Sequence, residues 1–243
     1  MLCDIGHVPI QGDREREPIR RWTLYLGALF LPLAFFGEKT ISLGPAMDCP
    51  THVLLAYRAL GDYFGSGREH GIRVTISPWR KSSSKAMPST VAAAGHYANS
   101  VLAMQDAVDR GFAEAILLND RGEVAEGTGE NIFFVKDGKI RTNDSDADVL
   151  HGITRATVIE LARDLGYDLE IGVLTVDELF AADEVFFTST AAEVTPLACI
   201  DDHVYATEKP VTLRYVRPIC ARSRAMTNGI EIGSRLRTKR PRS

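Results

Sequence analysis

Three short segments of the 243-residue chain carry polar side chains that could do chemistry. Residues 126–131 (EGTGEN) form a turn that presents two carboxylates, which could accept hydrogen bonds or move protons. Residues 188–196 (TSTAAEVTP) place hydroxyl groups where a predicted strand ends and a turn follows. Each of these two segments also has an ordinary interpretation, the first as a connection with solvated carboxylates and the second as a plain loop.

The third segment, residues 151–154 (HGIT), begins a predicted helix. The first backbone N–H groups of a helix have no carbonyl partner within it, and with the hydroxyl of Thr154 beside them they can bind an anion. An ordinary capped helix is the alternative for this motif taken alone. The three motifs are informative mainly because they occur together in one chain, in the order EGTGEN, HGIT, TSTAAEVTP.

The elements that must position these motifs alternate between strands and helices from residue 51 onward. Apolar and β-branched runs predict strands, and apolar faces followed by Gly111 or Gly166 predict helices. The Asp137-Gly138 pair predicts a tight hairpin. Together the elements indicate an α+β domain built mostly from antiparallel hairpins. Strands are expected at residues 52–57, 72–77, 114–120, 131–135, 169–174 and 184–188, and helices at 97–110, 153–166 and 176–181.

The composition is that of a globular protein with no attraction for polyanions. The chain is 45% hydrophobic and 25% charged and has a net charge of -4, so no overall positive field favours nucleic acid. The basic residues in 235–243 are expected to form a solvated end. The cysteines lack metal-ligand spacing, so no metal site is expected, and they predict reduced thiols in a cytoplasmic protein. They are Cys3, Cys49, Cys199 and Cys220.

The apolar run at residues 24–37 (LYLGALFLPLAFFG) could be a membrane segment or part of the protein interior. A membrane-spanning helix needs about 20 residues, whereas this run is shorter and contains Pro32. Arg20 and Arg21 could belong to an export signal, but the preceding stretch is long and mixed in charge, and no A-x-A cleavage pattern follows. A buried strand pair is therefore expected here, without a membrane partner.

Five segments follow one another between Trp79 and Pro196: WRKSSSKAMPST, GHYANS, VAEGTGENIF, LHGITR and ADEVFFTSTAAEVTP. Together they resemble the class IV aminotransferases, the pyridoxal phosphate enzymes of fold type IV, and most of all the branched-chain amino acid aminotransferases. The resemblance extends from about Cys49 to Leu197. It implies the large domain of the D-amino acid aminotransferase-like fold. Residues 1–48 would be a divergent remnant of a truncated small N-terminal domain, 49–205 the cofactor domain, and 206–243 a divergent C-terminal segment.

The resemblance implies a role in binding pyridoxal 5′-phosphate for each matched residue. Glu126 matches the carboxylate that bonds the pyridine nitrogen and keeps it protonated. Tyr97 matches the tyrosine at the cofactor's phenolic oxygen, and Leu150 matches the apolar residue on one face of the ring. The implied phosphate-binding residues are Ile153, Thr154 and Thr190, and the implied substrate-binding residues are Thr190 and Ala191.

The catalytic lysine of the family is missing. Ala92 stands at its position, five residues before Tyr97, and Ala94 stands where the family has a glycine. The lysine joins the cofactor covalently and moves protons, and acid–base catalysis alone is typically worth ~10²–10⁴-fold. Any bound cofactor is therefore expected to be held non-covalently.

Few other residues offer compensation for this loss. Lys81 and Lys85 are the nearest lysines, and both are expected to be solvated on a polar loop. His96 is expected to point away from the tyrosine's side in an alternating strand. Arg20 or Arg21 would correspond to a substrate-side arginine of the family, and no residue clearly matches its phosphate-binding arginine.

Three functions follow as alternatives. The first is a protein similar to a branched-chain aminotransferase that retains most of the cofactor pocket but transaminates amino and keto acids little or not at all. The second is a non-catalytic protein, either a decayed copy or the partner of an intact paralogue, that forms a homodimer or a mixed dimer through its large domain. The third is an enzyme that uses the pocket for lyase, cyclisation or isomerisation chemistry.

Overall fold

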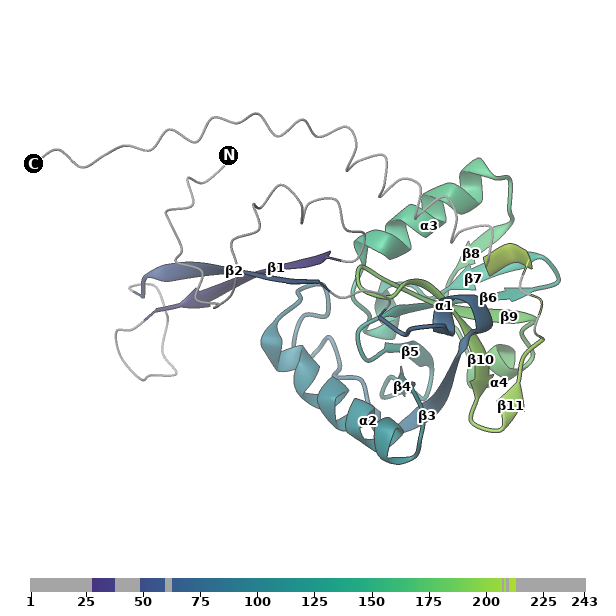
Figure 1. The fold of residues 1–243 in the computed structure, drawn as a ribbon, viewed down its shortest axis with the longest axis horizontal. Coiled ribbons are helices and arrows are strands. Elements are labelled where there is room, and N and C mark those ends of the chain that lie inside the picture. The colour runs from purple at the N-terminus through teal and green to yellow at the C-terminus, as the bar shows by residue number, and fades with distance from the viewer. Residues whose placement is uncertain (1–27, 38–48, 60–62, 207, 209, 213–243) are drawn as a thin grey trace, which may run out of the picture.

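The computed structural model describes residues 28–37, 49–59, 63–206, 208 and 210–212. In this part of the chain, a two-stranded ribbon projects from a larger body (Figure 1). The ribbon consists of β1 (Ala28–Phe36) and β2 (Thr51–Ala59), which pair antiparallel along their whole length. Arg20, Arg21 and the basic tail lie outside the described residues.

The body is built on a nine-stranded sheet in the order β5-β4-β3-β10-β9-β6-β7-β8, with β11 paired to β10. Most neighbours are antiparallel, but β3 pairs in parallel with both β4 and β10, and β7 pairs in parallel with β8. The expected α+β class is confirmed, although the sheet is more mixed than a series of hairpins. The strands are β3 (Ile72–Arg80), β4 (Glu114–Leu118), β5 (Val124–Gly127), β6 (Asn131–Lys136), β7 (Lys139–Thr142), β8 (Leu169–Ile171), β9 (Glu184–Ser189), β10 (Glu193–Ile200) and β11 (His203–Val204).

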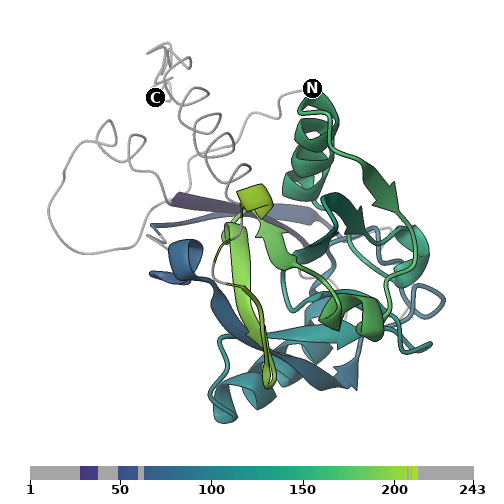
Figure 2. The same ribbon diagram turned by 90° about the vertical axis from the view of Figure 1, so that its right-hand side faces the viewer.

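The two long helices lie on opposite sides of the body (Figures 1 and 2). The helix α2 packs Ala103 and Ala107 against Ala115 and Leu117 of β4, and the small alanines let the helix approach the sheet closely. The helix α3 packs through Val158 and its neighbours against the strands β6 and β9. The helices are α1 (Gly67–His70), α2 (Tyr97–Asp109), α3 (Ile153–Asp164) and α4 (Val176–Phe180), with 3-10 turns at Ala94–His96 and Ser145–Ala147.

The strand β6 lies in the centre of the core and is buried on both faces. Phe133 and Val135 pack under α3, whereas Ile132 and Phe134 face the other cluster, which contains Leu179 of α4. The ring of Phe133 stacks on that of its cross-strand partner in β9, Phe186, with centroids 5.1 Å apart. Burial on both faces explains why the sequence of this strand is a continuous apolar run and not an alternating one.

The hairpin between β6 and β7 forms as the sequence predicts. Asp137 and Gly138 both have positive φ angles, 50° and 76°, which is the requirement of a type I′ turn. The register then pairs Lys136 with Lys139 across the turn. This hairpin fixes the direction in which the chain returns along the edge of the sheet.

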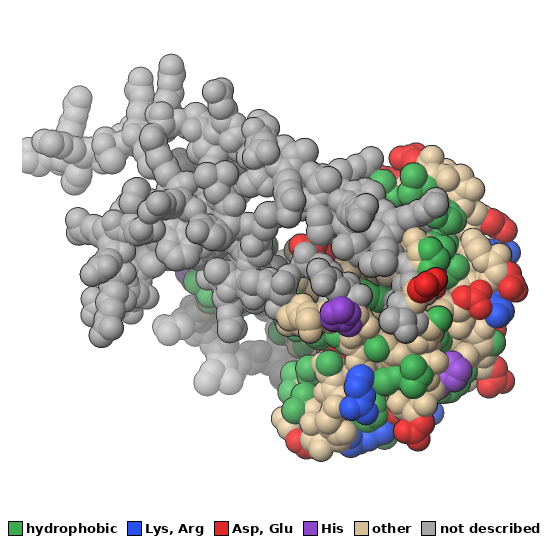
Figure 3. Space-filling model, turned by 45° about the vertical axis from the view of Figure 1, so that its right-hand side comes forward, with side chains coloured by type: hydrophobic (Ala, Val, Ile, Leu, Met, Phe, Trp, Pro, Cys, Tyr) green, Lys and Arg blue, Asp and Glu red, His purple; other side chains and the backbone are tan. Residues whose placement is uncertain are grey.

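The apolar run of the N-terminal region forms the strand β1, but the expectation that it is buried is wrong. Side chains along the described part of this strand are exposed, and Phe36 reaches 64% exposure. None of the helices in the described part of the chain has the length and apolar character needed to cross a membrane. On the face of the body seen in Figure 3, acidic and basic side chains are interspersed among apolar ones.

The stacked pair in the core provides a test of the fold. Replacing Phe133, which is fully buried, with alanine should lower the free energy of unfolding by about 3–5 kcal/mol, because it leaves a cavity between β6, β9 and α3. Phe35→Ala on the exposed ribbon is the matched control and should change it by about 0.5 kcal/mol or less. Denaturant unfolding measures both values, and equal losses would contradict this assignment of the core.

Candidate functional site

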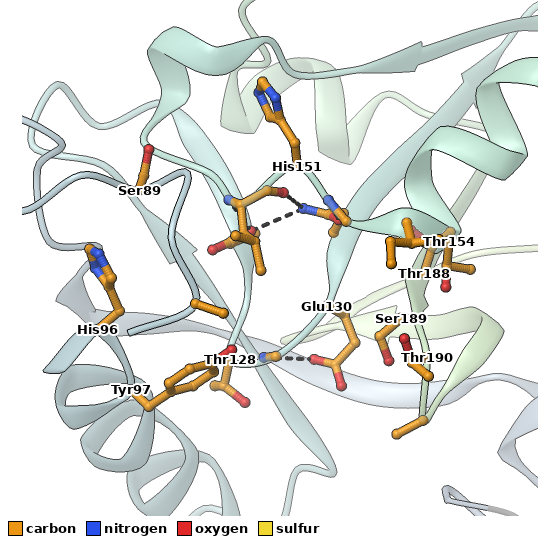
Figure 4. A pocket seen from close by; sticks show the side chains of 18 of the residues that line it. Ser89, His96, Tyr97, Thr128, Glu130, His151, Thr154, Thr188, Ser189 and Thr190 are labelled. Atoms are coloured by element: carbon orange, nitrogen blue, oxygen red, sulfur yellow. Dashed lines mark hydrogen bonds between the residues drawn. The ribbon is translucent and has the colours of Figure 1, made fainter. Parts of the chain in front are cut away.

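The described structure contains a cavity of about 420 Å³ where several loops and element ends meet. Its wall combines the segment after β3, the start of α2, the turn between β5 and β6, the start of α3 and the end of β9 (Figure 4). The structure brings every sequence-predicted site residue to this one cavity. These residues are Ala92, Tyr97, Glu126, Leu150, Ile153, Thr154, Thr190 and Ala191.

The carboxylate of Glu126 is fixed in the cavity by two hydrogen bonds and an ion pair. It lies near the end of β5 and is buried, and its Oε2 accepts hydrogen bonds from Asn131 Nδ2 at 3.0 Å and from the Leu150 amide at 3.1 Å. Its Oε1 lies 2.6 Å from Lys81 Nζ. Burial raises the pKa of the Glu126 carboxyl group, and the ammonium group of Lys81 opposes that rise. The carboxylate therefore faces the cavity with one oxygen bound to a cation.

Lys81 is buried at the cavity, so the prediction that it is solvated on a surface loop is wrong. It is only 8% exposed and it lines the cavity. Its backbone amide donates to the Leu118 carbonyl at 2.8 Å, which fixes the segment beside the sheet. A buried carboxylate requires a compensating charge. The role that the resemblance gives Glu126 could therefore have predicted that a nearby lysine is buried. Lys85 is exposed, as expected.

The start of α3 supplies backbone donors to the same cavity. Gly152 precedes the helix, no side chain caps it, and the first amide that bonds within the helix is that of Ala156. The earlier amides of Ile153 and Thr154 therefore have no carbonyl partner inside the helix. Hydroxyl groups of Thr154 and Thr190 lie on the same side of the cavity (Figure 4). Amides at a helix start together with hydroxyl groups form a suitable binding site for a phosphate group.

Asn131 connects the carboxylate to this helix start. Besides its bond to Glu126, its Nδ2 donates to the Leu150 carbonyl at 2.7 Å, and its Oδ1 accepts from the Gly152 amide at 3.2 Å. A Cβ atom at Gly152 would collide with that same Oδ1, so any larger residue here would displace the Asn131 side chain from its hydrogen bonds. The two motifs EGTGEN and HGIT are thus held together by one amide side chain.

The region around the missing lysine differs from the expected alternating strand. Ala92 precedes a 3-10 turn, Ala94–His96, and Tyr97 is the first residue of α2. His96 is buried, and its Nε2 lies 2.8 Å from the Pro88 carbonyl. The ring of Tyr97 points toward the cavity in Figure 4. Neither the alanine at position 92 nor this histidine supplies a free amine.

Two further carboxylates lie near the cavity: Glu130, the second carboxylate of the EGTGEN turn, and Glu114, which the sequence did not single out. Glu130 lines the cavity and Glu114, at the start of β4, lies behind it; both are buried. Burial and the neighbouring charge of Glu114 raise the pKa of Glu130 to about 8. Burial also raises the pKa of Glu114, although the Ala115 and Thr128 amides oppose it. In the described residues, no group of three or more His, Cys, Asp or Glu side chains is arranged to hold a metal ion.

This fold and this cavity define the class to which the protein belongs. The model of the family "Amino-transferase class IV" matches residues 44–200, and the chain belongs to this family. The family uses pyridoxal 5′-phosphate, and a carboxylate facing a helix start across one cavity suits its pyridine nitrogen and its phosphate group. The residues present therefore fit the cofactor, except that Ala92 offers no amine for a covalent bond.

Branched-chain aminotransferases of several organisms are similar to this chain. The probable branched-chain-amino-acid aminotransferase of Aquifex aeolicus is 40% identical over 189 residues, which are 77% of this chain and 60% of that protein. The enzyme of Escherichia coli strain K12 is 37% identical over 187 residues, 76% of this chain and 60% of that protein. The crystal structure of the Thermoproteus uzoniensis enzyme with norvaline gives a TM-score of 0.74 at 38% identity, over 84% of this chain and 66% of that one. The chain spans about 60% of the length of the first two relatives.

Lys81→Met tests the buried ion pair. The change leaves the Glu126 carboxylate without its cation, and at pH 8 it should lower the free energy of unfolding by about 3–5 kcal/mol. Lys85→Met on the exposed part of the same loop should have an effect within about 0.5 kcal/mol. Parallel denaturation curves for the two variants measure the difference, and a harmless Lys81→Met would show that the ion pair is not part of the folded protein.

The raised pKa of Glu130 predicts how stability depends on pH. The folded protein binds this proton more tightly than the unfolded chain, whose pKa is near 4.5, so the stabilisation is complete below that value. It is lost as the pH rises through about 8. The melting temperature of the wild type should therefore fall between pH 6 and 9 more than that of Glu130→Gln. Glu160→Gln, at an exposed position of α3, should behave like the wild type.

Proposed function

We propose that this protein binds pyridoxal 5′-phosphate non-covalently in the cavity, and that it catalyses transamination slowly or not at all. The observation that carries the proposal is the composition of the cavity wall. All eight predicted positions lie on it, yet the one at which the family bonds the cofactor, Ala92, ends in a methyl group. The site thus keeps its binding groups and lacks its nucleophile.

The binding groups divide between the two ends of the cofactor. Glu126 would accept a hydrogen bond from the pyridine nitrogen, and Leu150 would pack on the ring. The amides at the start of α3, with Thr154 and Thr190, would hold the phosphate group. When bound, the cofactor supplies an electron sink for charge that develops on a substrate carbon. The residues of the cavity wall would hold and orient the cofactor.

Transamination is expected to be weak or absent because the group that transfers the proton is missing. The family's lysine takes a proton from the substrate and returns it, and a methyl group at Ala92 cannot. Lys81 carries the amine nearest to the buried carboxylate, but it is paired with Glu126 at 2.6 Å. An ammonium group held in an ion pair has no lone pair with which to accept a proton, so it does not replace the lost base.

We also propose a ligand class, a cellular location and an oligomeric state for the protein. The names of the relatives favour branched-chain amino and keto acids as the ligand class. Cys49 and Cys199 are free cysteines, which supports a cytoplasmic location. A homodimer is proposed because the ribbon of β1 and β2 exposes apolar side chains that association would cover.

A second function, the non-catalytic partner of an intact paralogue, is favoured by one observation. The ribbon of β1 and β2 exposes apolar side chains, among them Phe36 and Val53, that a partner protein could cover. Such a protein would use the large domain for association, and its cavity would not need to be filled. Binding of the cofactor separates this function from the first.

A spectral titration with pyridoxal 5′-phosphate on the whole protein and on Ala92→Lys tests the proposal. The protein as it stands should show a cofactor band that dialysis removes, before and after borohydride treatment. Ala92→Lys should retain the cofactor after borohydride, and its transamination of leucine should be at least ~10²-fold faster. Ala92→Arg, which adds a cation but no reactive amine, is the matched control and should recover neither property.

Two results would contradict the proposal. Absence of binding in both proteins would favour the non-catalytic partner. Cofactor fixed by borohydride to a lysine of the unchanged protein, located by peptide mass spectrometry, would show that another amine has taken the role. Pyridoxine 5′-phosphate, which has no aldehyde, controls for adventitious reaction with exposed lysines such as Lys85.

A further inference from the structure

Glu130 lines the wall of the cavity, and a second buried carboxylate, Glu114, lies behind it; neither has a cation of its own among the described residues. Glu130 is 5% exposed and Glu114 is 1% exposed. Among the described residues, no lysine or arginine forms an ion pair with either of them, and the nearby ammonium group of Lys81 is bound to Glu126. Two like charges that are buried side by side cannot both ionise near neutral pH, so one of the two carboxyl groups keeps a proton.

The hydrogen bonds indicate which of the two keeps it. Glu114 Oε1 accepts from the Ala115 amide at 2.8 Å and from the Thr128 amide at 3.2 Å, and both bonds favour its charged form. Among the backbone donors of the described residues, Glu130 accepts from the Gly129 amide alone, at 3.0 Å. The consecutive amides of Thr128 and Gly129 bind one carboxyl group each, which holds Glu114 and Glu130 close together. Glu114 is therefore the charged member, and Glu130, the member that lines the cavity, is the acid.

Other ionisable groups around the pair reinforce this arrangement. Glu126, on β5, adds negative charge near Glu130, and Tyr63 is close enough to interact with both members of the pair. Burial and the charges of Glu130 and Glu114 raise the pKa of Tyr63, so it stays neutral. The ammonium group of Lys81 neutralises Glu126, and the buried guanidinium group of Arg155 also interacts with Glu126. A second charge on the pair would therefore have no counterion in the described part of the protein.

The opposite side of the cavity is built for an anion. The unpaired amides at the start of α3 point there, and the hydroxyl of Thr188, a residue 1% exposed, lines the cavity and has no hydrogen-bond partner among the described residues. In Figure 4, Thr188 and Thr154 lie on one side, and Glu130 lies on the floor between Thr128 and Ser189. An anion bound by these donors shares one small cavity with the carboxyl pair.

We propose that the cavity binds an anionic small molecule, carrying a phosphate or carboxylate group, only while Glu130 keeps the proton that it shares with Glu114. The inference rests on the proposed function for the presence of a ligand, and adds a control on its binding. Loss of the proton puts two negative charges at the wall of a cavity of low dielectric constant, where they repel an anion strongly. Ligand binding and proton binding are consequently coupled in this cavity.

Calorimetric titration of the whole protein with pyridoxine 5′-phosphate between pH 7 and 9 tests the coupling. The wild type should bind about tenfold more weakly at pH 9 than at pH 7, relative to Glu130→Gln, whose amide cannot ionise. Ionisation of the ligand itself is common to both proteins and cancels in the ratio. Glu160→Gln, at an exposed position outside the cavity, should follow the wild type.

A second variant and a second readout support the first. In Glu114→Gln, Glu130 loses its negative neighbour, so the fall in affinity should move to lower pH. Titrations of the wild type at pH 8 in buffers of different ionisation enthalpy should show protons taken up on binding, and those of Glu130→Gln should show fewer. The same pH dependence in the wild type and in Glu130→Gln would overturn the coupling alone. Absence of binding in every variant would overturn the proposed function as well.

Discussion

The buried carboxylate of Glu126 sets the constraint on which the rest of the site depends. A carboxylate in the interior is stable only if its charge and its lone pairs are satisfied. Meeting that requirement places Lys81 after β3, Asn131 at the start of β6 and the Leu150 amide before α3 around a single oxygen pair. Segments that are distant in the sequence are thereby fixed relative to one another, and the start of α3 is held facing the cavity.

The balance of charge around the cavity follows from the same constraint. Three glutamates meet there, and Lys81 is the only lysine among the described residues that line it. An additional amine at position 92 would alter that balance, whereas the alanine leaves an acidic end and an anion-binding end with little cation between them. The absence of the lysine is therefore also an electrostatic change, and the proton on Glu130 removes one negative charge from the acidic end.

Sequence reasoning succeeded where the signal is local. The helices α2 and α3, with glycine after each, and the turn at Asp137 and Gly138 all follow from spacing and backbone preference. The strands β5 and β10 escaped notice because their residues resemble a turn and a loop until their neighbours in the sheet are known. The burial of Lys81 and the exposure of β1 depend on tertiary contacts, which no local pattern records.

The site residues were located by resemblance, and their common cavity supports the assignment. Glu130 was different, because a glutamate in a glycine-rich turn is ordinarily solvated, and only the burial of Glu114 on a separate strand makes it an acid. Such properties arise from pairs of residues that are close in space. They become visible only when the sheet order is known.

The parallel pairing of β3 with β10 has a consequence for synthesis of the protein. Ile72 lies opposite Leu197, and Ile76 meets Asp201 across 125 residues of chain. At roughly 5–20 residues per second, β3 leaves the ribosome on the order of 6–25 s before its partner is translated. During that interval the edge of a central strand remains unpaired in the nascent chain and can associate with other strands. The order of synthesis thus leaves β3, an interior strand of the sheet, without its partner β10 until residues 193–200 have been made.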